Sequence, residues 1–203
     1  MTHFLFIAVF SIFTFTGAEQ CQEETQFSAG ATELTAISLK NTKGETVSLV
    51  DIKKHKASVF VLLSPECPLS QNYTLILHNL ERKFRSKNIK FYIIIPGSDF
   101  SFEEITDFEK QYNVTATVLL DNKYLLTKAL AATVTPEAII ADQEGKKIYQ
   151  GKIDNWAFAL GKKRQVITEY YVEDALYAHL ENQPITTKQT TPVGCFIFAK
   201  GHE

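Results

Sequence analysis

Val59-Phe60-Val61-Leu62-Leu63-Ser64-Pro65-Glu66-Cys67-Pro68-Leu69-Ser70 joins a continuous apolar run to a cysteine and a proline. The run at residues 59–63 predicts a buried strand, and Pro68 suits the first position of a helix. Cys67 then lies at a helix N-terminus, where unpaired N–H groups and the helix dipole stabilise a thiolate. A free cysteine is often only a small buried core residue, but this order of strand, cysteine, proline and helix favours a reactive thiol.

The rest of the chain alternates between helical and strand patterns. The helix after Cys67 carries an apolar stripe at helical spacing, formed by Tyr73, Leu77, Leu80 and Phe84. Ser101 and Glu104 form a capping-box pair that opens a second helix. The remaining predicted elements are strands at residues 90–95, 117–121, 138–142 and 147–150 and helices at residues 101–112, 124–131 and 172–180.

This alternation predicts an α/β fold. Buried strands separated by helices imply right-handed crossovers and a central sheet flanked by helices on both faces. The hairpin turn at residues 143–146 adds antiparallel strands, so the sheet is expected to be mixed. Residues 34–40 and 45–49, on either side of a turn, predict a β-hairpin extension ahead of the main fold.

Composition and charge argue against a nucleic-acid partner. The chain has 203 residues, with 21 basic and 23 acidic side chains and a net charge of −2. No basic cluster is large enough for a nucleic-acid footprint, so no nucleic-acid partner is expected. The short run Lys162-Lys163-Arg164 is interpreted as a solvated loop.

The N-terminus has the pattern of a targeting segment. Residues 4–15 are apolar but too short to span a membrane comfortably, and small residues follow, so residues 1–18 are predicted to be a signal peptide and residues 19–30 a flexible lead. The chain is therefore expected to be exported, to the periplasm or outside the cell. Cys21 would make it a membrane-attached lipoprotein if lipidated, although Gln20 fits that processing poorly.

Together these pieces resemble the thioredoxin fold, in the peroxiredoxin-like (AhpC/TSA-related) branch of the redoxins. The resemblance covers about residues 30–198 and rests on Cys67-Pro68 after a strand, on Thr135-Pro136 before residues 137–142, and on the segment at 149–154. The closing Gly194-Cys195-Phe196-Ile197 is similar to a subgroup that ends in a Gly-Cys-x-Ile segment. The expected organisation is a redoxin domain at residues 31–182 and a C-terminal tail at 183–203 that carries Cys195.

The resemblance also implies a site. Cys67 would be the nucleophile, and a cis-Pro136 loop, including Thr135, would pack against its sulfur, keep metals away and offer backbone groups to a disulfide substrate. From the residues alone, an ordinary trans turn at Pro136 is the alternative. Pro68 and Ser70 support the helix end, and neither a metal nor another cofactor is implied.

The chain departs from the thioredoxin and peroxiredoxin patterns at three positions. Ser70 replaces the second cysteine of a Cys-x-x-Cys pair, Phe60 replaces a peroxiredoxin proline, and Glu137 has the wrong charge where an arginine would polarise a peroxide. Ser64 stands where a peroxiredoxin has threonine. With Ser70 at the usual resolving position, Cys195 is the only plausible internal partner of Cys67; the alternative for Cys195 is a buried residue that anchors the tail.

The predicted function is an exported thiol–disulfide oxidoreductase or thiol-dependent peroxidase. Its partners would be protein thiols and disulfides or a peroxide, together with an external reductant. One alternative is a copper chaperone on the same fold, with Cys67, Cys195 and either His179 or His202 as ligands at no recognised spacing. Another is a redoxin-fold binding domain without turnover.

Overall fold

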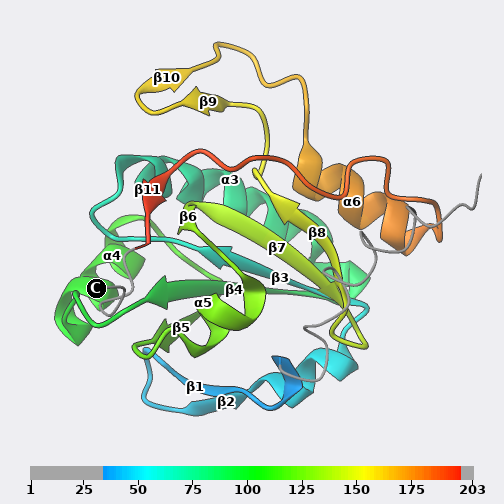
Figure 1. Ribbon diagram of the computed structural model, residues 1–203. Helices are drawn as coiled ribbons and strands as arrows, with labels where there is room; N and C mark the ends of the chain where they lie inside the picture. The colour runs from blue at the N-terminus through cyan, green and yellow to red at the C-terminus, as the bar shows by residue number, and fades with distance from the viewer. Residues whose placement is uncertain (1–33, 198–203) are drawn as a thin grey trace, which may run out of the picture.

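The central feature is a seven-stranded sheet with the strand order β2-β1-β5-β4-β3-β7-β8 (Figure 1). The structure is a computed structural model that describes residues 34–197. The sheet consists of β1 (Ser38–Asn41), β2 (Thr46–Ser48), β3 (Ala57–Leu62), β4 (Ile89–Pro96), β5 (Thr117–Asp121), β7 (Glu137–Asp142) and β8 (Lys147–Gly151).

The sheet is mixed, as predicted. β3 pairs in parallel with β4, and β4 pairs in parallel with β5, while β7, β8, β1 and β2 join by antiparallel pairing. Helix α3 (Pro68–Phe84) connects β3 to β4, and α4 (Phe102–Gln111) connects β4 to β5. The predicted N-terminal hairpin is confirmed as β1 and β2, followed by a 3-10 helix, η1 (Leu49–Lys54).

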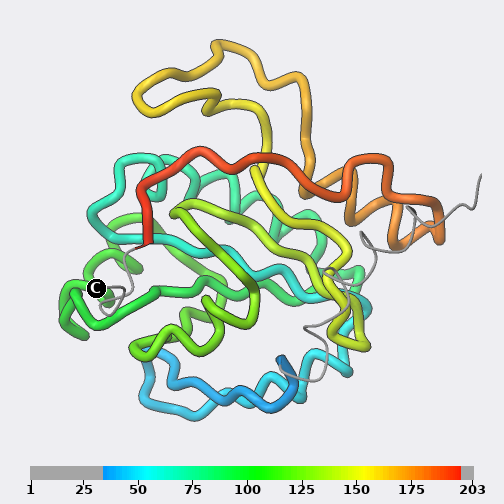
Figure 2. Tube along the Cα trace, viewed as in Figure 1, coloured from blue at the N-terminus to red at the C-terminus, as the bar shows by residue number. Residues whose placement is uncertain are grey.

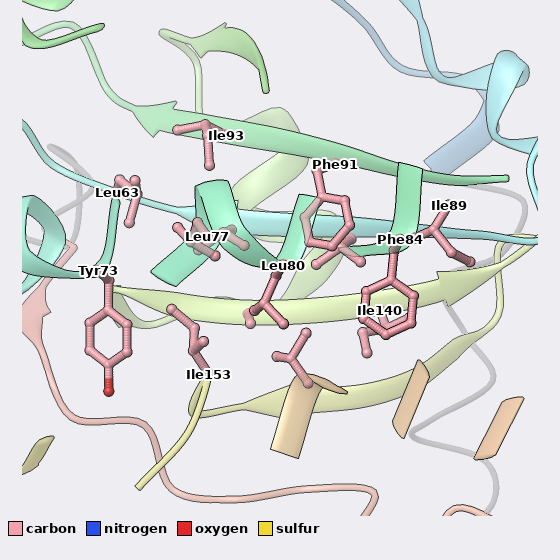
Figure 3. Packing of buried hydrophobic residues seen from close by; sticks show 14 of the residues in the cluster. Leu63, Tyr73, Leu77, Leu80, Phe84, Ile89, Phe91, Ile93, Ile140 and Ile153 are labelled. Carbon is pink, nitrogen blue, oxygen red and sulfur yellow. The ribbon is translucent and has the colours of Figure 1, made fainter. Parts of the chain in front are cut away.

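Each face of the sheet buries its own apolar cluster. α3, α4 and α6 (Tyr171–Leu180) cover one face, where the α3 stripe packs on strand residues such as Phe91, Ile93 and Ile140 (Figure 3). α5 (Leu125–Leu130) and η1 cover the other face. β3 is buried along its whole length because both of its faces lie under helices. Both layers were predicted from the alternation of buried strands and helices.

The helix ends follow from local chemistry. The capping box of α4 is present: the Ser101 hydroxyl accepts a hydrogen bond from the Glu104 N–H at 3.2 Å, and the Glu104 carboxylate accepts one from the Ser101 N–H at 2.7 Å. Pro68 is the first residue of α3, and Cys67 is its N-cap. The helix therefore begins directly after the cysteine, as the sequence predicted.

Two small two-stranded sheets outside the main sheet were not predicted. β9 (Ala157–Ala159) pairs with β10 (Lys162–Lys163), so the interpretation of residues 162–164 as a plain loop was wrong for the first two. β11 (Cys195–Phe196) pairs with β6 (Val134–Thr135), and the segment before it crosses the end of the domain to reach that position (Figure 2). The tail is therefore part of the folded domain up to Ile197.

Some predictions fall outside the described residues. These are the signal peptide, the flexible lead, Cys21 and His202. Within residues 34–197, no helix combines the length and the apolar character needed to cross a membrane.

Candidate active site

Cys67 lies in the turn between β3 and α3. Its N–H donates to the Ser64 carbonyl at 3.1 Å, and its own carbonyl accepts from the Gln71 N–H at 3.0 Å. The Ser64 N–H donates to the buried Ser70 hydroxyl at 3.1 Å, which ties the end of the strand to the first turn of the helix. Ser64, Pro68 and Ser70 therefore shape the turn, and the side chain of Cys67 is only 3% exposed.

The second cysteine lies against the first. Cys67 Sγ and Cys195 Sγ are 2.8 Å apart although 128 residues separate them in the chain, and both are free thiols. The Cys67 thiol also donates to the Thr135 carbonyl at 3.3 Å. A disulfide is about 2.05 Å long, so only a small approach of the two sulfurs separates this arrangement from a covalent bond.

Pairing of β11 with β6 places Cys195 opposite Thr135. The Thr135–Pro136 peptide is cis, as the resemblance implied. Cys195 is the register partner of Thr135, and the Ile197 N–H donates to the Thr133 carbonyl at 3.0 Å. The short β11 therefore holds the second sulfur in place.

Gly194 allows this close approach. A Cβ at Gly194 would overlap the Thr135 carbonyl group and lie 3.0 Å from the Pro136 nitrogen. A real Cβ does not reach these distances, so any larger residue would push the tail away from the loop. The sequence shows a glycine beside Cys195, but it does not show that this glycine contacts the backbone of Thr135 and Pro136.

A second attachment holds the tail before Cys195. The Thr190 N–H donates to the Gln150 carbonyl at 3.0 Å, and the Thr190 hydroxyl accepts from the Lys152 N–H at 2.8 Å. Gly151, with φ at +141°, leaves the space that Thr190 fills. The segment at residues 191–194 is thus fixed at both of its ends.

Glu137, which carries the wrong charge where an arginine would polarise a peroxide, is a buried residue of β7. Its side chain is 2% exposed and accepts hydrogen bonds from the Thr133 N–H and from the Gln150 amide, both at 2.8 Å. Gln150 in turn accepts from the buried Lys147 ammonium at 3.0 Å. Because these bonds hold the residues just before the cis-Pro136 loop, Glu137 is a positioning residue for β6.

The two thiols differ in acidity. Burial raises the pKa of Cys67, but hydrogen bonds from Cys195 and from the backbone and hydroxyl of Ser70 outweigh it, so the pKa is lowered overall. Burial, the hydrogen bond to Cys67 and the charge of Cys67 raise the pKa of Cys195 to about 11. Cys67 is therefore the thiolate of the pair and Cys195 the thiol that donates to it. Glu66, which could oppose a thiolate, is exposed to solvent.

This asymmetry predicts how the reduced protein reacts with iodoacetamide. In a Cys21→Ser background, Cys67 should be alkylated with a pH midpoint below the ordinary thiol value of about 8.5. Cys195→Ala removes the strongest hydrogen bond that lowers the pKa of Cys67, so its midpoint should rise. Mass spectrometry of the alkylated peptide over a pH series measures both. A midpoint for Cys67 at the ordinary value in the unsubstituted pair would instead favour the inert binding domain.

Of the residues offered for a copper site, His179 lies away from the two cysteines, and His202 lies outside the described residues. His179 forms a 2.9 Å hydrogen bond with the Lys56 carbonyl, just before β3 begins, whereas Cys67 follows the other end of β3. Among residues 34–197, no group of three or more His, Cys, Asp or Glu side chains has the arrangement to hold a metal ion.

Comparisons with known proteins agree with this arrangement. The family model described as Redoxin matches residues 28–156, more than half of the chain. Comparison with curated proteins gave no match.

Among solved structures, a hypothetical protein from Sinorhizobium meliloti 1021 aligns with a TM-score of 0.72 at 22% identity, over 81% of this chain and 92% of that one. An uncharacterized conserved protein from Geobacillus kaustophilus aligns with a TM-score of 0.71 at 25% identity, over 82% and 90%. A secreted Mycobacterium tuberculosis disulfide oxidoreductase, homologous to E. coli DsbE, aligns with a TM-score of 0.52 at 14% identity, over 74% and 98%. These likenesses show the thioredoxin-like fold.

Proposed function

This chain belongs to the redoxin family, and on that premise we propose that it is a thiol–disulfide oxidoreductase with Cys67 as the nucleophile and Cys195 as the resolving thiol. The observation that carries the proposal is the 2.8 Å separation of the two sulfurs. The lowered pKa of Cys67 and the raised pKa of Cys195 support the assignment of the two roles.

The reaction has two displacement steps. The Cys67 thiolate attacks one sulfur of a substrate disulfide, which forms a mixed disulfide and releases the other substrate sulfur as a thiolate. Cys195 then loses its proton to solvent or to that leaving thiolate and attacks Cys67 Sγ, which releases the second substrate thiolate. The protein ends with a Cys67–Cys195 disulfide and the substrate has gained two electrons. An external thiol reductant reverses both steps.

The buried state of Cys67 requires the tail to move before a large substrate can react. β11 and β6 have two residues each, so few hydrogen bonds must open to expose the sulfur. The attachment at Thr190 can remain closed, because it lies before the segment that carries Cys195. We therefore expect the opening to be confined to residues 191–197.

Disulfides fit this site better than peroxides. The groups that contact or hydrogen-bond to the Cys67 sulfur come from Cys195, Ser70, Leu69 and Thr135, and none of them is cationic. A peroxide would oxidise Cys67 to a sulfenic acid, which Cys195 would convert to the same disulfide with release of water. Among residues 34–197, the groups that hydrogen-bond to the sulfur thus supply no positive charge for that first step.

The proposed setting is an exported protein. The apolar stretch at residues 4–15 supports export, and an oxidising compartment would let the pair cycle. The partners would then be exported proteins with thiols or disulfides, and an external reductant would restore the dithiol.

Disulfide mapping tests the proposal directly. The full chain with Cys21→Ser is treated with a mild oxidant, blocked with an alkylating agent and digested without reduction. We expect the peptide containing Cys67 to be linked to the peptide containing Cys195 in nearly all molecules. If both peptides carry the alkyl group while the protein still reduces a disulfide substrate, the two-cysteine mechanism is wrong.

A further inference from the structure

A basic arm projects from the domain next to the two cysteines. We use this name for residues 157–166, which comprise β9, the turn at Leu160 and Gly161, β10 and the residues up to Val166. Its two strands pair only with each other, and the hairpin stands away from the main sheet (Figure 1). The match to the Redoxin family model ends at residue 156, so the arm lies outside the part of the chain that the family model describes.

The surface of the arm combines apolar and cationic side chains. Phe158, Leu160 and Val166 are 47%, 61% and 69% exposed. Lys162, Lys163 and Arg164 are also exposed. Residues 157–168 contain no Asp or Glu, although the whole chain has a net charge of −2. Single exposed apolar residues are ordinary, but several of them together with charges of one sign indicate an interaction surface.

Two of the positive charges are held in place by Phe158 of the arm and by Trp156 directly before it. Lys163 Nζ lies 5.5 Å from the centre of the Trp156 ring, and the Arg164 guanidinium lies 5.5 Å from the centre of the Phe158 ring. The Arg164 N–H also donates to the Trp156 carbonyl at 2.7 Å. Cation–π contacts of this kind restrict flexible side chains, so less conformational entropy is lost when a partner binds them.

The base of the arm is fastened to the helix that begins at Cys67. The Tyr73 hydroxyl donates to the buried Asp154 carboxylate at 2.7 Å, and the same oxygen of Asp154 accepts from the Trp156 N–H at 2.8 Å. The Ala157 N–H donates to the Tyr73 hydroxyl oxygen at 3.4 Å. The orientation of the arm is therefore tied to α3.

The arm also adjoins the tail and the cis-proline loop. Ala157, Pro136 and Val193 line one small cavity of about 10 Å³, which is room for at most one water molecule. Pro136 follows Thr135, whose carbonyl accepts from the Cys67 thiol, and Val193 is two residues before Cys195. A protein bound to the arm would consequently lie over the segment that must open.

We propose that the basic arm is the docking element for the protein that exchanges thiols with Cys67 and Cys195, and that this partner presents its cysteine beside acidic and apolar side chains. This rests on the proposed function. Charge complementarity with Lys162, Lys163 and Arg164 selects the acidic residues, and Phe158 and Leu160 select the apolar ones. The position of the arm beside the thiols favours a thiol-bearing partner over an anionic membrane.

The test uses two peptide reductants on the oxidised full chain with Cys21→Ser. Each has five residues with a cysteine between leucine and phenylalanine, and the ends are glutamates in one peptide and lysines in the other. A peptide thiolate attacks the Cys67–Cys195 disulfide and forms a mixed disulfide, and a second peptide thiol completes the reduction. Each rate is divided by the rate of the same peptide with a small aromatic disulfide, which corrects for intrinsic thiol reactivity.

The unsubstituted arm should favour the acidic peptide by about tenfold at low ionic strength, and the preference should shrink in added salt. Reversing the charges with Lys162→Glu, Lys163→Glu and Arg164→Glu should make the lysine peptide the faster reductant. Phe158→Ser combined with Leu160→Ser should lower the corrected rate of both peptides. Dithiothreitol should reduce every variant at the same rate, because it needs no docking.

Two results would overturn the arm's role. One is an equal corrected rate for both peptides, unchanged by charge reversal. The other is binding to vesicles of anionic phospholipid that charge reversal abolishes, without any peptide preference, which would assign the arm to a membrane surface. Failure of the proposed function looks different: no Cys67–Cys195 disulfide forms at all, so dithiothreitol has nothing to reduce.

Discussion

Cys67→Ser should abolish disulfide exchange, and Cys195→Ser should stop it after its first step. A serine hydroxyl is not ionised at neutral pH and cannot form a disulfide, so the first variant has no nucleophile. The second keeps the thiolate but has no internal thiol to expel the bound substrate. The two variants are thus expected to fail at different steps.

An aromatic disulfide that releases a coloured thiolate separates these steps. In a Cys21→Ser background, the reduced parent should release two equivalents of colour per chain and end as the internal disulfide. Cys195→Ser should release one equivalent quickly and retain an aromatic adduct on Cys67, visible by mass spectrometry. Cys67→Ser should react only slowly, because the pKa of the remaining thiol is raised by burial and the protein offers it no internal target.

The outcome also decides between assignments of the two cysteines. A rapid first equivalent from Cys67→Ser, with the adduct on Cys195, would contradict the assigned roles and make Cys195 the attacking thiol. If, with an external thiol added, Cys195→Ser turns over the aromatic disulfide as fast as the parent, the external thiol resolves the mixed disulfide and Cys195 is only an anchor of the tail.

The helices and strands that position Cys67 were predictable because each has a strong local pattern. The apolar run before Cys67, the stripe from Tyr73 to Phe84 and the Ser101–Glu104 capping box are all visible in a single window of sequence. The cis form of Thr135-Pro136 is not among these local signals, because it follows only from the resemblance to the thioredoxin fold. The local patterns therefore predict the thiol and its helix end.

The elements that bring Cys195 to Cys67 were harder to predict from the sequence. β6 and β11 have two residues each, too few to show a periodicity, and their pairing joins residues about 60 positions apart. The hydrogen bonds of Glu137 were also not predictable, because a charged residue inside a strand pattern does not reveal whether it is buried with partners. The strands of the basic arm are equally short, so the pattern at Lys162-Lys163-Arg164 predicted only a solvated loop.

Gly194 is where this tertiary arrangement is most sensitive to a single change. In Gly194→Ala the new methyl group would overlap the Thr135 carbonyl and crowd the Pro136 nitrogen. Both neighbours are backbone atoms of a short paired loop, so they have little freedom to move aside. The tail is expected to shift instead, and the Cys195 sulfur would leave its position 2.8 Å from Cys67. A displacement of about 1 Å between reacting groups slows a reaction by about 100-fold.

The expected signature is a selective loss of the second step. Gly194→Ala should still release the first equivalent of coloured thiolate, since Cys67 itself is unchanged, and the second about 100-fold more slowly. Gly44→Ala is the matched control: it adds the same methyl group where no atom lies within 4 Å, at φ +79° in the hairpin between β1 and β2. It should lose about 1–2 kcal/mol of unfolding free energy to backbone strain and keep both rates. A folded Gly194→Ala protein with an unchanged second step would contradict the role assigned to β11, because the resolving thiol would then not depend on the close contact between Gly194 and the cis-proline loop.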